Sequence, residues 1–149
     1  MQNNSFTTEF TVDQTPDTVF AAIANVRQYW GTGATGDFER EGDEFTYRDA
    51  DLMSHFRLSE VVPARRMVWQ VVDSRTGFVQ DPAEWDDTRV VFELAPDGDG
   101  TRLHFTHEGL TPDKECFNDC SRGWSGVIDD ALQHLITTGR SVFDDQTAR

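Results

Sequence analysis

The sequence predicts an α+β protein in which a curved antiparallel sheet packs around one long helix near the C-terminus. Residues 121–139, SRGWSGVIDDALQHLITTG, place apolar side chains at helical spacing and polar ones on the other side of the helix. The apolar stripe consists of Trp124, Val127, Ile128, Ala131, Leu132, Leu135 and Ile136. Most other apolar residues occur in short runs that alternate with polar ones, which is typical of strands. Because so broad an apolar stripe needs a broad apolar cover, we expect a sheet of about six or seven strands wrapped around this helix.

The ends of this helix are marked by residues that favour helix termini. Ser121 is the expected N-cap, and Gly139 can adopt the left-handed conformation that ends a helix. Gly123 and Gly126 lie in the first turns, against their low helix propensity. We expect them to allow either a close approach of the sheet or a wider pocket mouth.

The N-terminal region predicts one strand and then short helices. Residues 5–12 alternate apolar and polar side chains, so they form the first expected strand. Thr15 is the expected cap of a helix with Pro16 at its first position, and the helical pattern stops at Tyr29-Trp30-Gly31. The pattern allows one short helix or a helix kinked into two.

The middle of the chain predicts a series of antiparallel strands separated by turns. Residues 73–87 are expected to form a long loop anchored by Phe78 and Trp85, and residues 96–100 a tight turn. A helical turn is expected at Thr111-Pro112. The expected strands are 37–40 and 44–48, joined by a tight turn at 41–43, then 53–62, 66–72, 88–95 and 101–108.

Size and charge favour one acidic globular domain. The 149 residues, with 37% hydrophobic content, suffice for a single core, which we expect to be ordered over about residues 5–139 with a frayed tail at 140–149. The net charge of −14 argues against nucleic acid or an anionic membrane as a partner. The start of the chain lacks the features of a signal peptide, and no apolar run approaches membrane-spanning length, so we expect a cytoplasmic protein.

Two cysteines, Cys116 and Cys120, lie at a spacing that would place them on one helix face. Two thiols without a second ligand pair do not complete a zinc site, and a cytoplasmic setting keeps thiols reduced. We therefore expect small buried side chains, with no disulfide, no metal and no cofactor.

His107 is the main candidate for polar chemistry. It alternates with Leu103 and Phe105, so it should face inward, near Trp124. Three roles are open: a core histidine with hydrogen bonds, a group that orients a ligand, and a catalytic base. The sequence contains no nucleophile elbow, phosphate loop, dinucleotide-binding glycine pattern or metal-binding histidine motif, so no catalytic residue is assigned.

Aromatic side chains exceed what a small solid core needs, and a cavity lined by rings with few polar groups is the usual form of a small-molecule site. Tyr47 and His107 are the expected polar groups of this cavity. The expected ligand-binding residues are Phe38, Tyr47, Trp69, Phe92, Phe105, His107, Trp124 and Ile128.

Several segments resemble the SRPBCC superfamily, which has the START-like or helix-grip fold, and within it the bacterial group related to the activator of the heat-shock-protein-90 ATPase. The segments that carry the resemblance are NVRQYW at 25–30, VVPARRMVWQVVDS at 61–74, EW at 84–85, FTHEGLTPDKECFNDCSRGW at 105–124 and LITTG at 135–139. The resemblance implies a helix-grip fold over nearly the whole chain. It also implies an apolar small-molecule ligand held between sheet and long helix, because members of the superfamily bind such molecules and some have become cyclases or hydrolases.

Three functions follow as hypotheses. The first is a module that binds an apolar or aromatic small molecule, with a homodimer as an open alternative to a monomer. The second is a cyclase- or hydrolase-type enzyme with His107 as acid-base residue and Tyr47 as proton or hydrogen-bond donor. The third, suggested by the resemblance, is a domain that interacts with a chaperone.

Overall fold

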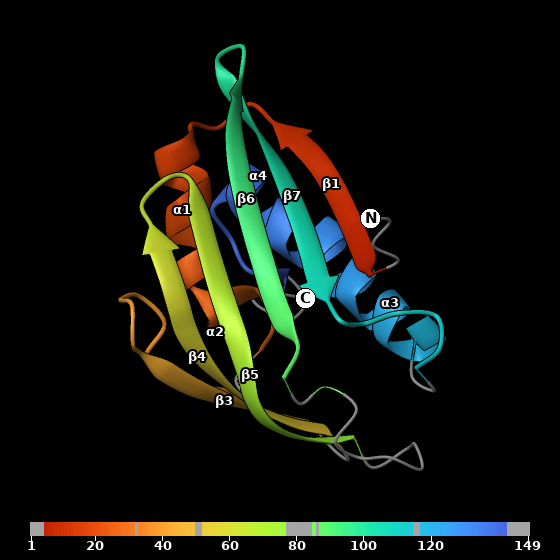
Figure 1. Ribbon diagram of the computed structural model, residues 1–149. Helices are drawn as coiled ribbons and strands as arrows, with labels where there is room; N and C mark the ends of the chain where they lie inside the picture. Colours follow the sequence, from red (N-terminus) through yellow and green to blue (C-terminus); the bar gives the residue numbers. More distant parts are fainter. Residues whose placement is uncertain are drawn as a thin grey trace.

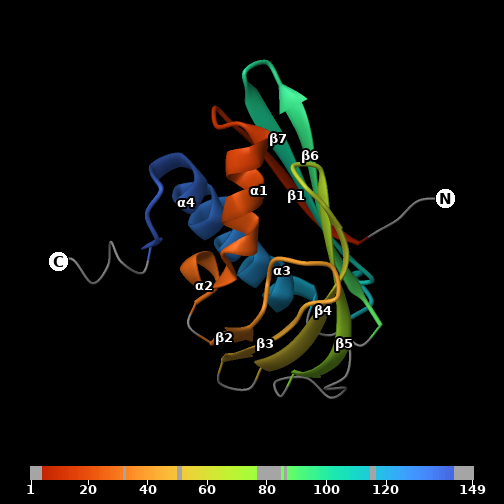
Figure 2. The same ribbon diagram turned by 90° about the vertical axis from the view of Figure 1, so that its left-hand side faces the viewer.

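The computed structural model describes residues 5–31, 33–49, 52–76, 85, 87–114 and 117–142. Within them, seven strands form one antiparallel sheet in the order β1-β7-β6-β5-β4-β3-β2, and the helices lie on one face of it (Figures 1 and 2). This confirms the predicted fold class. The strands are β1 Phe6–Val12, β2 Ala34–Gly36, β3 Glu44–Asp49, β4 Leu52–Val62, β5 Arg66–Thr76, β6 Arg89–Asp97 and β7 Gly100–Glu108.

The N-terminal helical region is divided into α1, Pro16–Ala24, and α2, Val26–Tyr29. Thr15 caps α1 through its hydroxyl oxygen, which accepts a hydrogen bond from the backbone N–H of Thr18 at 3.4 Å. The kink at Asn25 is held by the buried Tyr29, whose hydroxyl donates to the carbonyl of Ile23 at 2.7 Å. Of the two predicted forms, the kinked one is present.

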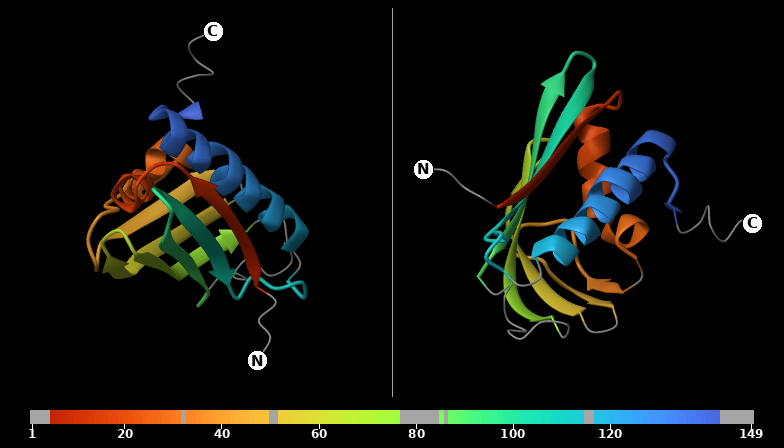
Figure 3. Two further views of the ribbon diagram at one scale, coloured as in Figure 1. Left: turned by 90° about the horizontal axis from the view of Figure 1, so that it is seen from above. Right: turned by 90° about the vertical axis from the view of Figure 1, so that its right-hand side faces the viewer.

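The long C-terminal helix is continuous from α3, Phe117–Ser125, through a π-helical segment η1, Gly126–Leu132, to α4, Gln133–Thr138. It crosses the concave side of the sheet (Figure 3). The expected start at Ser121 is wrong, because Ser121 lies inside α3 and the backbone N–H of Phe117 already bonds the carbonyl of Lys114 at 3.1 Å. The expected end is confirmed by Gly139, whose φ of 75° is left-handed.

The π-helical segment is not predicted by the sequence pattern. At its C-terminal end the backbone N–H of Gln133 bonds the carbonyls of Ile128, five residues back, and Asp130, three residues back, and not that of Asp129 at the α-helical spacing. Trp124, Ile128 and Leu132 are nevertheless all buried, as the apolar stripe predicts. The π-helical winding therefore leaves the apolar stripe buried against the sheet.

Two sheet predictions need correction. Residues 37–40 form no strand, because Gly36 ends β2 at a φ of 131° and the carboxylate of Asp43 accepts hydrogen bonds from the backbone N–H groups of Glu39 and Arg40. The strand that pairs with β3 at this edge is β2, before the glycine. β5 extends to Thr76, beyond the expected end at residue 72. The turn expected at Thr111-Pro112 is present, and the backbone N–H of Lys114 bonds the carbonyl of Thr111 at 2.9 Å. Phe78 lies outside the described residues.

The core lies between the sheet and the long helix. Leu103, Phe105 and His107 on β7 are all fully buried, as their alternation predicts, and they pair across the sheet with buried residues of β6. Phe105 approaches Trp124 of α3 with 4.8 Å between ring centroids. The alternation of β7 therefore determines which side chains meet the helix.

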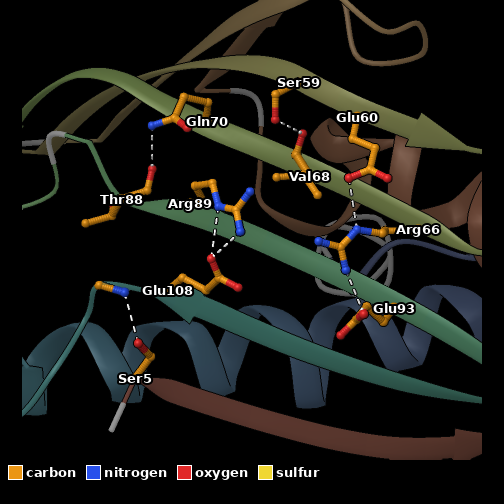
Figure 4. Close-up of polar contacts among 11 residues, drawn as sticks. Ser5, Ser59, Glu60, Arg66, Val68, Gln70, Thr88, Arg89, Glu93 and Glu108 are labelled. Carbon is orange, nitrogen blue, oxygen red and sulfur yellow. Dashed lines mark hydrogen bonds and ion pairs between the residues drawn. The ribbon is translucent and has the colours of Figure 1, made fainter. Parts of the chain in front are cut away.

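The opposite face of the sheet carries ion pairs (Figure 4). Arg66 bridges Glu60 and Glu93, with nitrogen–oxygen distances of 3.0 and 2.6 Å, and Arg89 pairs with Glu108 at 2.6 Å. The apolar face of the sheet is therefore the one that the helices cover. No helix of the described residues is long and apolar enough to span a membrane.

Candidate ligand pocket

A pocket of about 570 Å³ opens between the first half of the long helix, the end of α2 and strand β3. Its described lining comprises an aromatic wall, a helical side and a polar rim. The aromatic wall is Tyr29, Trp30, Tyr47, Trp85 and Trp124; the helical side is Cys120, Gly123, Gly126, Val127 and Ala131; the rim is Asp119, Arg122 and Asp130; and Leu52 and Val142 complete it.

Trp30 is the centre of the aromatic wall. Its ring is stacked on Tyr47, with centroids 4.1 Å apart and an interplanar angle of 13°, and it lies 5.0 Å from Trp124. Trp85 is stacked on Trp124, with ring centroids 5.8 Å apart and an interplanar angle of 14°. These offset and tilted ring pairs add to the stability that burial alone supplies, so the wall is a packed part of the core that also faces the pocket.

His107 lies directly behind this wall and makes two buried hydrogen bonds. The indole N–H of Trp124 donates to His107 Nδ1 at 3.0 Å, so Nδ1 is unprotonated and the ring proton is on Nε2. Nε2 donates to the hydroxyl oxygen of Thr88 at 2.8 Å, and that hydroxyl donates to the carbonyl of Trp85 at 2.6 Å. Burial lowers the pKa of His107 to about 3, which keeps the imidazole neutral.

This network connects two residues of the aromatic wall. Trp124 comes from the long helix and Trp85 from the segment before β6, and His107 on β7 bonds both, the second through Thr88. Both ring nitrogens of His107 are thus used within the protein, and the residue is not among those that line the pocket. Its geometry fits a core histidine that positions the wall.

The structure separates the eight expected site residues into three groups. Tyr47 and Trp124 line the pocket. Trp69, Phe92, Phe105, His107 and Ile128 are fully buried in the core next to it; Trp69, for example, lies 6.1 Å from Trp30. Phe38 packs on Phe45 at 4.9 Å and borders a separate polar hollow of about 460 Å³ with Asp37, Glu39, Arg40 and Asp43.

Sequence reasoning missed Trp30 and Trp85 as pocket residues. The sequence pattern places Trp30 at the end of a helix, and it does follow α2 as its C-cap. The pattern around Trp85 indicates a loop anchor, which its 3% exposure supports. The residue type itself could have predicted their burial, because the large apolar ring of a tryptophan in a turn or loop usually packs against other apolar groups.

The two glycines of the helix leave room in the pocket. A Cβ added at Gly123 or Gly126 would meet no atom of the described residues within 4 Å. Of the two roles expected for them, a wider pocket mouth therefore fits and a close approach of the sheet does not. Gly126 is also the first residue of the π-helical segment, and such segments often occur at functional sites.

The rim contains one ion pair and one further carboxylate. Arg122 pairs with Asp119 at 2.6 Å, and both side chains are exposed. Asp130 is exposed and has no ion-pair partner among the described residues, whereas its neighbour Asp129 accepts a hydrogen bond from Thr8 of β1 at 2.7 Å.

Cys120 is the cysteine that lies within the described residues. Cys120 is buried against the pocket, and Cys116 lies outside the described residues. Within the described part of the chain, no group of three or more histidine, cysteine or acidic side chains is arranged to hold a metal ion.

The seven-stranded sheet around a long C-terminal helix, with short helices after the first strand, defines a helix-grip protein. Residues 13–137 match the family model described as "Activator of Hsp90 ATPase homolog 1-like protein", and the chain belongs to this family. No match was found among curated proteins.

Solved structures with the same fold include the Aha1 dimer from Colwellia psychrerythraea, with 18% identity and a TM-score of 0.74 over 93% of this chain and 98% of that one. The Mll3558 protein from Rhizobium loti is 27% identical, with a TM-score of 0.69 over 90% of this chain and 98% of the other. CalU16 from Micromonospora echinospora is 20% identical, with a TM-score of 0.64 over 89% and 74% of the two chains.

Proposed function

We propose that this protein binds an apolar or aromatic small molecule in the pocket beside Trp30 and Trp124. The observation that carries the proposal is a space of about 570 Å³ bordered by aromatic rings on one side and by two glycines of the long helix on the other. Small-molecule sites are commonly of this size and lined by apolar and aromatic groups with few polar ones.

The wall is preorganised for such a ligand. Trp30, Trp85 and Trp124 are at most 9% exposed and are held by ring packing and by the His107 network. Binding therefore costs little ordering of these side chains, and an affinity in the micromolar range, about −8 kcal/mol, is a reasonable expectation for a flat ligand.

The enzyme hypothesis receives less support. It needs His107 as an acid-base group that reaches the ligand, but both nitrogens of His107 are hydrogen-bonded in the core and its pKa is about 3. Tyr47 does line the pocket, but it has no histidine beside it there among the described lining residues. Ligand binding without chemistry is therefore the preferred proposal.

The chaperone hypothesis and the homodimer alternative rest on similarity to known proteins. A chaperone partner is suggested by the family's description, and a homodimer by the Colwellia structure, which is that of an Aha1 dimer. Sedimentation of the purified protein would test the dimer, for which a single species of 16.9 kDa would be the contradicting result.

The pocket can be tested with a neutral, environment-sensitive dye such as 6-propionyl-2-dimethylaminonaphthalene. We expect a blue-shifted emission with micromolar affinity for the native protein. Gly126→Leu should abolish this binding, because the new side chain occupies the open space, while the fold is retained since leucine favours helix more than glycine does.

The matched control is Asn118→Leu, on an exposed position of α3 that does not line the pocket. It adds the same side chain to the same helix and should leave dye binding unchanged. Dye binding that survives in Gly126→Leu, or no binding by the native protein, would contradict the proposed function.

A further inference from the structure

We propose that the pocket selects a flat ligand that carries a positive charge, such as a protonated amine or a quaternary ammonium on a ring system. This inference rests on the proposed binding function and specifies the class of ligand. It follows from the hydrogen bonds of the aromatic wall and from the charges of the rim.

The aromatic wall presents rings rather than hydrogen-bond donors at two of its residues. The hydroxyl of Tyr29 donates to the carbonyl of Ile23 at 2.7 Å, and the indole N–H of Trp124 donates to His107 at 3.0 Å. Their polar ends are thus turned into the protein. A ring face that borders the pocket can attract a cation, because the face of an aromatic ring is the negative part of its quadrupole.

The rim adds a negative charge to this wall. The guanidinium of Arg122 is paired with Asp119 at 2.6 Å, so the two charges largely cancel. Asp130 remains as an exposed carboxylate with no ionic partner among the described residues. Arg122 is also the sole cationic side chain in the described lining.

An anionic ligand would meet the opposite conditions. The cationic donor of the lining, Arg122, is already paired with Asp119, so the buried indole N–H of Trp85 is a neutral donor that remains for an anion. An anion would also approach a protein with a net charge of −14. The same net charge attracts a cation and raises its local concentration at the pocket mouth, an effect that salt screens. Charge complementarity therefore favours a cation over an anion of the same shape.

Three two-ring probes of similar size separate charge from shape: 1-methylquinolinium, 1-methylnaphthalene and 1-naphthoate. Titration calorimetry at pH 7.5 and low salt should show the cation binding at least about ten-fold more tightly than the anion. Asp130→Asn should reduce this ratio by about two- to five-fold, as expected for an exposed charge. Added salt should reduce it as well.

The control variant is Asp99→Asn, which makes the same change of net charge at the exposed turn between β6 and β7, away from the pocket lining. It should leave the ratio within about two-fold of the native value. An equal change in both variants would show that Asp130 has no local role and would overturn the inference.

The outcomes distinguish the two proposals. If 1-methylnaphthalene binds and Gly126→Leu blocks it, but the anion binds as tightly as the cation, charge selection is wrong and the pocket remains. If none of the three probes binds, the proposed function fails and the inference fails with it.

Discussion

The indole N–H of Trp124 donates a 3.0 Å hydrogen bond to Nδ1 of His107, and the two side chains are 3% and 0% exposed. The bond joins the long helix to β7 at the back of the pocket. Because it is shielded from water, each partner depends on the other to satisfy a buried polar atom.

We expect His107→Ala to lower the free energy of unfolding by about 2–4 kcal/mol, because Trp124 and Thr88 lose their partner and a cavity is left. Trp124→Phe removes the N–H donor together with part of the buried indole ring. A double-mutant cycle of the two changes, measured by urea unfolding, should give a coupling energy of about 1 kcal/mol. The pair of His107→Ala with Asp99→Asn is the control and should be additive. Additivity in the first cycle too would show that the hydrogen bond contributes nothing.

The stability of the protein should fall on acidification because of His107. Its pKa is about 3 in the folded state, against 6.5 for an unperturbed histidine, since burial disfavours the charged form. Between these pH values the unfolded chain takes up a proton that the folded chain does not. The contribution of neutral His107 to the free energy of unfolding is therefore complete above about pH 6.5. It is lost as the pH falls toward 3, at no more than about 1.4 kcal/mol per pH unit.

Urea unfolding at pH 7.5, 6 and 5 measures this effect, with His107→Gln as the reference because glutamine does not titrate. The difference in unfolding free energy between the native protein and His107→Gln should shrink steadily as the pH falls. Parallel pH dependences for the two proteins would be inconsistent with a neutral buried imidazole.

Leu132 and Asp130 test the orientation of the π-helical segment. Leu132 is fully buried and Asp130 is exposed, although both belong to η1. Leu132→Ala should cost about 2–5 kcal/mol through lost burial and a cavity, whereas Asp130→Ala should stay within about 0.5 kcal/mol. Denaturant unfolding of both variants measures the two costs. Equal costs would mean that Leu132 and Asp130 do not lie on the buried and exposed sides of the helix, respectively.

Local patterns of the sequence determined much of the fold. The alternation of Leu103, Phe105 and His107 predicted their burial because strand side chains point to opposite faces regardless of what lies beyond. Thr15 and Gly139 marked helix ends because their capping geometry involves only neighbouring residues. The apolar stripe of the long helix likewise follows from local spacing, and its width predicted a sheet to cover it.

Only the tertiary structure decided where the pocket lies. Trp30, Trp85 and Trp124 are far apart in the sequence, and no local pattern says that their rings pack together. His107 was predicted to face inward, but only the positions of Trp124 and Thr88 show that both its nitrogens are occupied. The π-helical winding at Gly126 likewise has no signature in a 3.6-residue pattern, because it depends on how the helix packs against its neighbours. The sequence by itself thus determined which side chains are buried, since burial follows from local periodicity. The space left between them was decided by long-range packing.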